Sequence, residues 1–229
     1  MENLYYSDII YLVSFLITLI AQIFVSSSYS RYKKVLNSKD NTGYDTARKI
    51  LDKNNLEDVM ILETKGNLTD HYDPKRKVIK LSTDIYHGSS IASAAVAAHE
   101  CGHAIQDKNK YMPMRIRSAI VPFVNICTRL GYLAIIIGLI FNRSPLFEAG
   151  IILLLAMLVF QLITLPVEFN ASKRALKELE KEKILDKEEK GSARNMLVAA
   201  AFTYVASVLS TLLQIFRLVL ISSSSDRRR

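Results

Sequence analysis

Long apolar stretches without charge, separated by strongly charged segments, constrain this chain more than any other feature. Residues 9–30 contain no charged residue, and the part from Ile9 to Val25 is apolar enough for a membrane-spanning helix, which takes about 20 residues. Three further apolar stretches follow, at residues 119–141, 149–167 and 195–216. Together they predict a mainly α-helical membrane protein with about four transmembrane helices and a small extramembrane part that contains helices and strands.

The charge balance fits a membrane protein better than a soluble one. Hydrophobic residues make up 50% of the 229 residues, yet 30 Lys and Arg against 22 Asp and Glu give a net charge of +8. Basic residues that flank membrane helices on the cytoplasmic side, against anionic lipid, explain this combination. The chain carries no nucleic-acid-binding motif, and its two cysteines are too few for a disulfide framework. The predicted partner is therefore the lipid bilayer and not a nucleic acid.

The charges around the first apolar stretch predict its orientation. Glu2 and Asp8 precede it, whereas Arg31, Lys33 and Lys34 follow it. The positive-inside rule then places the N-terminus outside and residue 31 onward in the cytoplasm. A cleaved signal peptide is the alternative, but the start lacks a basic region and no small-residue cleavage pattern follows. We therefore expect a retained transmembrane anchor.

Residues 31–117 contain no long apolar run and are predicted to form the extramembrane part. The apolar positions of residues 44–53 indicate a short amphipathic helix. Residues 59–63 and 77–82 have strand composition and are separated by turn residues, which predicts a β-hairpin. Such a hairpin either covers a neighbouring helix or binds an extended peptide along its edge.

The sequence from His99 to His103 is H-E-x-x-H, inside a predicted helix over residues 91–106 that Ser89 or Ser90 can cap. On a helix, His99 and His103 project from one side, and Glu100 lies close enough to reach a water held by a metal. Neutral imidazoles suit zinc, and a nearby carboxylate can take the water's proton. This pattern predicts hydrolysis. Cys101 projects from a different face, which favours packing over metal binding.

Two histidines do not complete a catalytic zinc site, which usually has three protein ligands. Glu168 is the candidate third ligand, because it follows the predicted transmembrane hairpin on the same side as His99 and His103. Alternatively, Glu168 is an interfacial residue that begins a charged helix. Arg129 interrupts the first helix of the hairpin; it either lies near the cytoplasmic surface or faces a polar cavity.

Four segments resemble a known bacterial membrane family, the YugP-type neutral zinc metallopeptidases. They are NLTDHYDP at 67–74, AAHECGHAIQ at 97–106, LPVEFNAS at 165–172 and AAFTYVA at 200–206. By analogy with related membrane peptidases of the HtpX and CAAX-protease types, the resemblance implies one zinc ion bound by His99, His103 and Glu168, with Glu100 as general base. It also implies a peptide or protein substrate and a bacterial-type cell membrane.

The chain departs from this pattern beside the third ligand. Ser172 stands where the HtpX and CAAX-protease types carry an acidic residue, and Asn170 stands where the YugP-type pattern has Asp. Such carboxylates often orient a ligand histidine. Asp70, Asp73 or a backbone carbonyl could take over that role.

Two further side chains are candidates for a place near the reaction. His71 either stabilises the oxyanion of the tetrahedral intermediate or a local turn. Tyr204 either directs its hydroxyl at the site or packs within the last apolar helix.

These observations predict a membrane-embedded zinc-dependent metalloendopeptidase with a cytoplasmic active site. A non-catalytic membrane scaffold with a structural zinc site is the alternative. The predicted divisions are a first transmembrane helix at 1–30, a cytoplasmic zincin-like part with the hairpin and the HExxH helix at 31–117, a transmembrane hairpin at 118–167, a charged cytoplasmic helix at 168–194, and a fourth transmembrane segment with a basic tail at 195–229. Four spans leave Arg227 to Arg229 outside, against the positive-inside rule, so a last segment that does not fully cross is the alternative.

Overall fold

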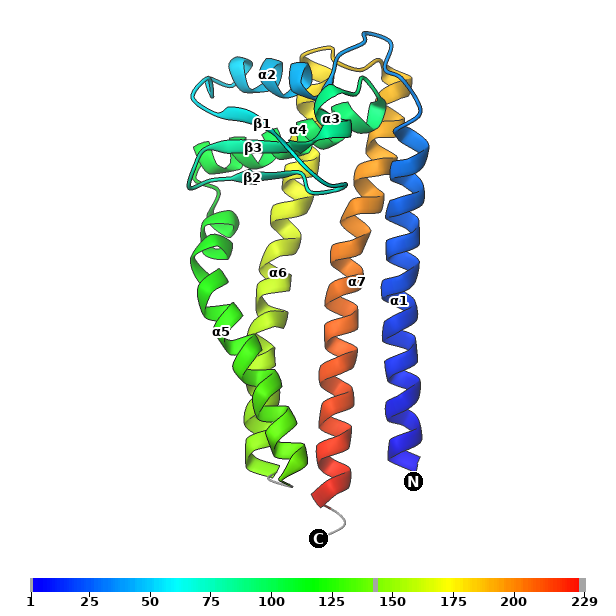
Figure 1. Cartoon of the computed structure of the whole chain (residues 1–229), viewed down its shortest axis with the longest axis vertical. Coiled ribbons are helices and arrows are strands. Elements are labelled where there is room, and N and C mark those ends of the chain that lie inside the picture. The colour runs from blue at the N-terminus through cyan, green and yellow to red at the C-terminus, as the bar shows by residue number, and fades with distance from the viewer. Residues whose placement is uncertain (1, 142–143, 227–229) are drawn as a thin grey trace. The chain divides into compact units, whose positions relative to one another are not determined.

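The computed structural model describes residues 2–141 and 144–226, and it is mainly helical (Figure 1). Its helices are α1 (Glu2–Tyr32), α2 (Gly43–Lys53), α3 (Thr83–His87), α4 (Ile91–Lys108), α5 (Met112–Ile140), α6 (Ser144–Lys181) and α7 (Lys187–Asp226), and its strands are β1 (Met60–Thr64), β2 (His71–Asp73) and β3 (Val78–Ser82). The described residues form two compact units. Segments 1–22, 116–165 and 203–229 contribute to the bundle unit, and segments 23–115 and 166–202 form the head unit.

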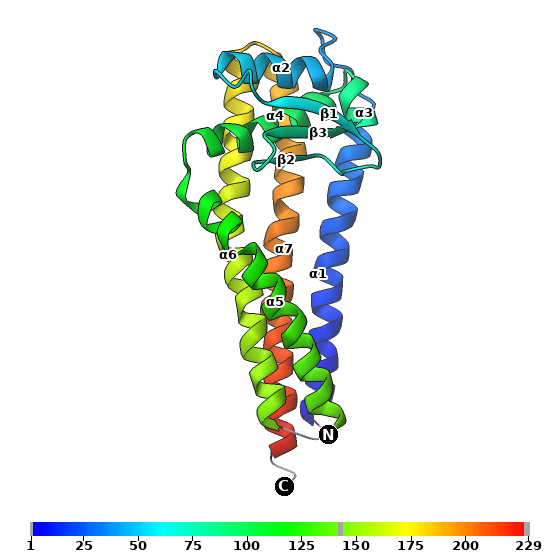
Figure 2. The same cartoon turned by 60° about the vertical axis from the view of Figure 1, so that its left-hand side comes forward.

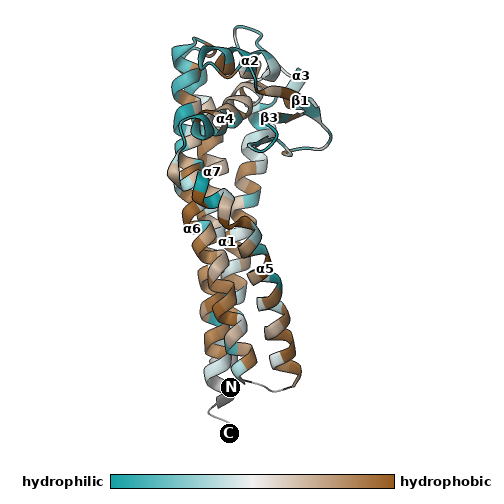
Figure 3. Cartoon of the chain, turned by 90° about the vertical axis from the view of Figure 1, so that its left-hand side faces the viewer, coloured by the Kyte–Doolittle hydropathy of each residue, from teal (hydrophilic) through white to brown (hydrophobic). Residues whose placement is uncertain are grey.

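Four of the described helices, α1, α5, α6 and α7, are long and apolar enough to cross a membrane. This confirms the number of candidate spans that the apolar stretches predict. Hydrophobic residues colour these helices along most of their length in Figure 3. Many of their large apolar side chains are exposed, as expected for helices whose outer surface contacts lipid.

Close packing joins α5 to α6 within the bundle unit. A Cβ atom added to Gly150 of α6 would lie 2.7 Å from the backbone oxygen of Gly131 on α5, so only a residue without a side chain fits there. Polar contacts join α1 to α7: Gln214 Nε2 donates to Ser14 Oγ at 3.2 Å, and Arg217 Nε donates to the Ser7 carbonyl at 3.1 Å. Partly buried polar contacts of this kind hold membrane helices together where lipid offers no competing partner.

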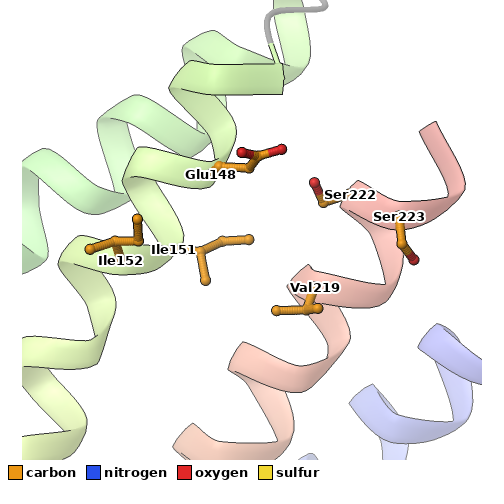
Figure 4. A pocket seen from close by; sticks show the side chains of 6 residues that line it. All are labelled: Glu148, Ile151, Ile152, Val219, Ser222 and Ser223. Carbon is orange, nitrogen blue, oxygen red and sulfur yellow. The ribbon is translucent and has the colours of Figure 1, made fainter. Parts of the chain in front are cut away.

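The first and last described residues lie at the same end of the bundle unit (Figure 1), which agrees with an even number of spans. The basic tail, Arg227 to Arg229, lies outside the described residues. Arg129 is exposed on the side of α5. A cavity of about 360 Å³ lies between α6 and α7 and has largely apolar walls (Figure 4). Its lining residues are Glu148, Ile151, Ile152, Val219, Ser222 and Ser223.

The head unit contains the strands, in the order β1-β3-β2 among the described residues. β1 and β3 occupy nearly the predicted residues, but they pair in parallel, with Ile61 opposite Ile79. The predicted hairpin between them is therefore wrong. Parallel pairing needs the chain to return to its starting end, and the unpredicted strand β2 provides this return. β2 pairs antiparallel with β3, with Tyr72 opposite Ile79.

α4 lies beside the sheet and under α2, as both Figure 1 and Figure 2 show. α2 begins with a capping box, in which Thr42 and Asp45 satisfy each other's backbone N–H groups. The small side chains of α4 allow close packing on several sides, and all of its alanines are fully buried. This apolar interior, which includes Ile50, Leu81 and Leu179, holds the helix of the metal motif in place.

Two predicted helix boundaries require correction. α6 continues without a break through Glu168 to Lys181, and α7 already begins at Lys187. The separate charged helix predicted for residues 168–194 is thus the end of one long helix and the start of the next. Glu168 consequently projects from the interior of a helix, which fixes its backbone more firmly than a helix end would.

Candidate metal centre

The head unit brings the three predicted ligands together. Ser90 caps the start of α4, because its hydroxyl accepts a hydrogen bond from the Ser93 N–H, and α4 carries His99 and His103 on the face toward α6. The two helices approach very closely beside the histidines. A Cβ atom added to Gly102 would lie 2.5 Å from the Ala171 carbonyl oxygen of α6. Gly102 therefore permits the approach that brings Glu168 to the histidines.

The geometry of the triad fits a zinc ion. The Nε2 atoms of His99 and His103 lie 3.3 Å and 3.6 Å from Glu168 Oε2, and all three ligand atoms fall within 4.8 Å of one another. Two ligands bound tetrahedrally to zinc at about 2.1 Å lie about 3.4 Å apart, which is close to both spacings. Glu168 is 3% exposed, so its negative charge requires a cation in the immediate surroundings.

The electrostatics of this pocket also favour positive charge. Burial of the His103 ring disfavours its charged form, but the hydrogen bond with Glu168 and the nearby Glu100 carboxylate outweigh burial and raise the pKa of His103. A pocket that stabilises a proton on a buried imidazole stabilises a metal cation at the same nitrogen for the same electrostatic reason.

The second nitrogen of each histidine has its own partner. His99 Nδ1 lies 3.2 Å from Ser172 Oγ, and His103 Nδ1 lies 3.0 Å from Gln106 Oε1. In the sequence, Ser172 is notable only because related families have an acidic residue there, and no sequence pattern marks Gln106. Residues three or four apart lie on the same side of a helix. Ser172 is four residues after Glu168 and Gln106 is three residues after His103, so each lies on the side of its helix that carries a proposed ligand. Such partners set the orientation of a ligand histidine.

Glu100 lies next to the triad and is 6% exposed. In the part of the chain that the structure describes, no hydrogen bond or ion pair joins its carboxylate to another protein group. A buried carboxylate without protein donors is stabilised only by groups that enter the site, such as water or a cation. This arrangement suits a general base.

The other sequence candidates have contacts of a different kind. The half-buried carboxylate of Asp70 accepts hydrogen bonds from the backbone N–H of Ser82 at 2.7 Å and from its hydroxyl, and its partial burial raises its pKa. His71 is exposed, and its Nδ1 lies 2.8 Å from the Thr69 carbonyl, as expected for a residue that stabilises a turn. Cys101 packs against α2, where its Sγ lies 3.6 Å from the Ala47 carbonyl.

Asp73 and Tyr204 are the two remaining candidates. Asp73 accepts hydrogen bonds from the backbone N–H groups of Lys75 and Arg76 in the β2–β3 turn. Tyr204 is half-buried in the segment of α7 that belongs to the bundle unit. The reaction roles of His71 and Tyr204 stay predictions.

Comparisons with known proteins show the family of this chain. A family model described as "Putative neutral zinc metallopeptidase" matches residues 7–223. The chain is also 44% identical, over 201 residues, to a Bacillus subtilis (strain 168) protein named "Putative membrane protease YugP"; the match covers 88% of this chain and 89% of that protein. No solved structure matches the chain.

Proposed function

Because this chain belongs to the neutral zinc metallopeptidase family, we propose that it is a membrane-embedded zinc-dependent metalloendopeptidase with its active site at the cytoplasmic membrane face. The observation that carries the proposal is the arrangement of His99, His103 and Glu168 at zinc-ligand spacing beside the buried carboxylate of Glu100. Three protein ligands leave a fourth position open, as catalytic zinc sites require.

The side chains divide the work of peptide hydrolysis. The two imidazoles and Glu168 would hold the ion, which would lower the pKa of water and polarise the scissile carbonyl. Glu100 accepts the proton of the attacking water on its carboxylate and later gives it to the leaving amine. Its burial keeps competing water away and strengthens its electrostatic interactions with the reacting groups.

The edge of the sheet suits an extended substrate. In the described sheet the outer edge of β2 has no strand beside it, and Tyr72 fixes β2 to α4 by donating a hydrogen bond to Asp107 at 2.9 Å. A peptide that adds to this edge would make backbone hydrogen bonds that do not depend on its side chains. This mode of binding favours cleavage of polypeptides over recognition of one small molecule.

Replacement of Glu100 by Gln tests the general-base role. The variant keeps the shape of the side chain and all three proposed ligands, so we expect normal zinc content but at least about 100-fold slower cleavage of casein. Glu57→Gln changes an exposed carboxylate and is the matched control, with unchanged turnover. Turnover of Glu100→Gln close to the wild-type rate would refute the enzymatic proposal.

A structural zinc site in a membrane scaffold is the competing function. Such a site is closed by four protein ligands. Among the described residues, the group around Glu168 offers three. X-ray absorption of the zinc protein distinguishes the two, because a catalytic site contains an exchangeable oxygen ligand in addition to its two imidazoles and Glu168.

The cytoplasmic location follows from the basic residues after α1 and has its own test. Lys75 is exposed in the β2–β3 turn of the head unit, whereas Cys101 and Cys127 are buried. A Lys75→Cys variant in intact cells should react with a membrane-impermeant maleimide only after the membrane is opened. Labelling of intact cells would place the head unit outside.

A further inference from the structure

A chain of hydrogen bonds leads from His103 into α6. His103 Nδ1 lies 3.0 Å from Gln106 Oε1, and Gln106 Nε2 donates to the Val167 carbonyl at 2.8 Å and to Asn170 Oδ1 at 3.0 Å. At the far end, Arg174 Nε donates to the same Asn170 Oδ1 at 2.7 Å. These hydrogen bonds thus connect the metal-binding helix α4 to α6, the helix that carries Glu168.

Arg174 determines which group donates and which accepts in each of these hydrogen bonds. A guanidinium group only donates hydrogen bonds, so the Asn170 atom that faces Arg174 must be the amide oxygen. That oxygen can only accept, and Gln106 must therefore turn its NH₂ group toward Asn170. The Val167 carbonyl, a second acceptor, requires the same orientation. Gln106 then presents its oxygen to His103.

An oxygen at this place decides which nitrogen of His103 carries the proton. Gln106 Oε1 accepts a hydrogen bond, so Nδ1 of His103 must be protonated. Metal binding displaces any proton from Nε2, which faces Glu168 Oε2 at 3.6 Å, and because Nδ1 keeps its own proton the lone pair of the neutral ring is then on Nε2. His99 has no comparable constraint, because the hydroxyl of Ser172 can donate or accept.

We propose that Gln106 is a positioning residue that holds His103 in its metal-binding tautomer, and that Arg174, acting through Asn170, fixes the orientation of the Gln106 amide. This inference rests on the proposed zinc site. Gln106 is fully buried and bonded at both ends of its amide, so the amide cannot rotate without leaving buried polar groups unpaired. The ligand histidine is consequently preorganised before a metal arrives.

The test measures zinc affinity of the full-length purified protein by competition with a chelator. Gln106→Met keeps the length of the side chain but removes both ends of the amide, and we expect the zinc Kd to rise about 10- to 100-fold. Arg174→Met leaves every ligand and Gln106 in place, and its half-buried position makes misfolding of little concern. Its zinc Kd should rise several-fold, because the orientation of Asn170 is then no longer fixed.

Asn37→Ala is the matched control for loss of a buried amide. Asn37 is 4% exposed, donates to the carbonyls of Asn41 and Ser89, and accepts from the Asn41 N–H, so its removal costs stability without touching the chain of bonds to His103. We expect a lower unfolding temperature and an unchanged zinc Kd for this variant.

Three results would overturn the inference. A zinc Kd of Gln106→Met within twofold of the wild type removes the positioning role. Equal losses of zinc affinity in Gln106→Met and Asn37→Ala assign the effect to stability alone, and an unchanged Kd in Arg174→Met removes the part assigned to Arg174. If the wild-type protein itself binds no zinc, the proposed function fails together with this inference, whereas normal wild-type binding confines the failure to Gln106.

Discussion

Replacement of Gly102 by Ala should separate the ligands of the metal centre. Gly102 lies between the two ligand histidines in the sequence, and its α-carbon faces the backbone of α6 at Ala171. The added methyl group would lie 2.5 Å from the Ala171 carbonyl oxygen and 3.1 Å from its carbonyl carbon. These neighbours are backbone atoms of a long helix, so they cannot turn away as a flexible side chain can.

The size of the effect follows from these contacts. Comfortable non-bonded contacts to carbon lie at about 3.5 Å, so α4 and α6 must part by about 1 Å. Glu168 is less than one turn of helix from Ala171 and moves with it. Zinc ligands tolerate displacements of about 0.2 Å, several times less than this shift. We therefore expect the zinc Kd to rise at least about 100-fold, with a loss of about 1–3 kcal/mol in the free energy of unfolding from overpacking.

Chelator competition and thermal unfolding of the purified protein measure both quantities. Gly191→Ala is the matched control, because an added Cβ at this α7 position meets no atom within 4 Å. The control should bind zinc normally and gain about 0.4–1 kcal/mol of stability from reduced freedom of the unfolded chain. A folded Gly102→Ala protein that binds zinc within twofold of the wild type would refute the argument that helix spacing sets the metal site.

Three further predictions concern the same unit. Glu168→Ala should lose tightly bound zinc, as determined by metal analysis, and full retention of zinc would exclude Glu168 as a ligand. Burial raises the pKa of the Cys101 thiol, so the thiol stays protonated at pH 8. Its alkylation by iodoacetamide, measured by mass spectrometry, should therefore be far slower in the native than in the unfolded protein. Equal rates would contradict the packing of Cys101 against Ala47. A fragment of residues 31–117 should bind zinc much more weakly than the whole chain, because it lacks Glu168 and all of α6, and calorimetric affinities that match would disprove the need for α6.

Features with a local cause could be predicted from the sequence. The apolar stretches predict α1, α5, α6 and α7 because a bilayer requires a minimum length of apolar helix. Ser90 and the alanines that follow it predict the start of α4 because capping and helix propensity act within a few residues. The spacing of His99 and His103 predicts their common face for the same reason.

Features that depend on distant segments could not be predicted. β2 has three residues, too few and too polar to give a strand signal, yet it reverses the chain and makes β1 and β3 parallel. The charged residues beyond Glu168 do not indicate that α6 continues to Lys181. Lys and Glu alternate beyond Glu168 much as in a separate solvated helix, but α6 continues because its buried face, which includes Leu179, packs in the head unit.

The hydrogen-bond partners of the two ligand histidines show how much of the site can be predicted from the sequence. The predicted helix of the metal motif ends at Gln106. A polar residue is as typical of a helix end as of a position that orients a ligand, so the sequence does not reveal the role of Gln106. α4 continues to Lys108, so Gln106 lies within the helix, on the face of His103. Its role becomes visible only when Val167 and Asn170 of α6 lie beside it and determine the orientation of its amide. The residues beside a ligand are thus recognised by what both helices place around them. Neutral groups stand beside the second nitrogens of both histidines in place of carboxylates: the Gln106 amide, with its fixed hydrogen-bond direction, lies beside His103, and the Ser172 hydroxyl lies beside His99.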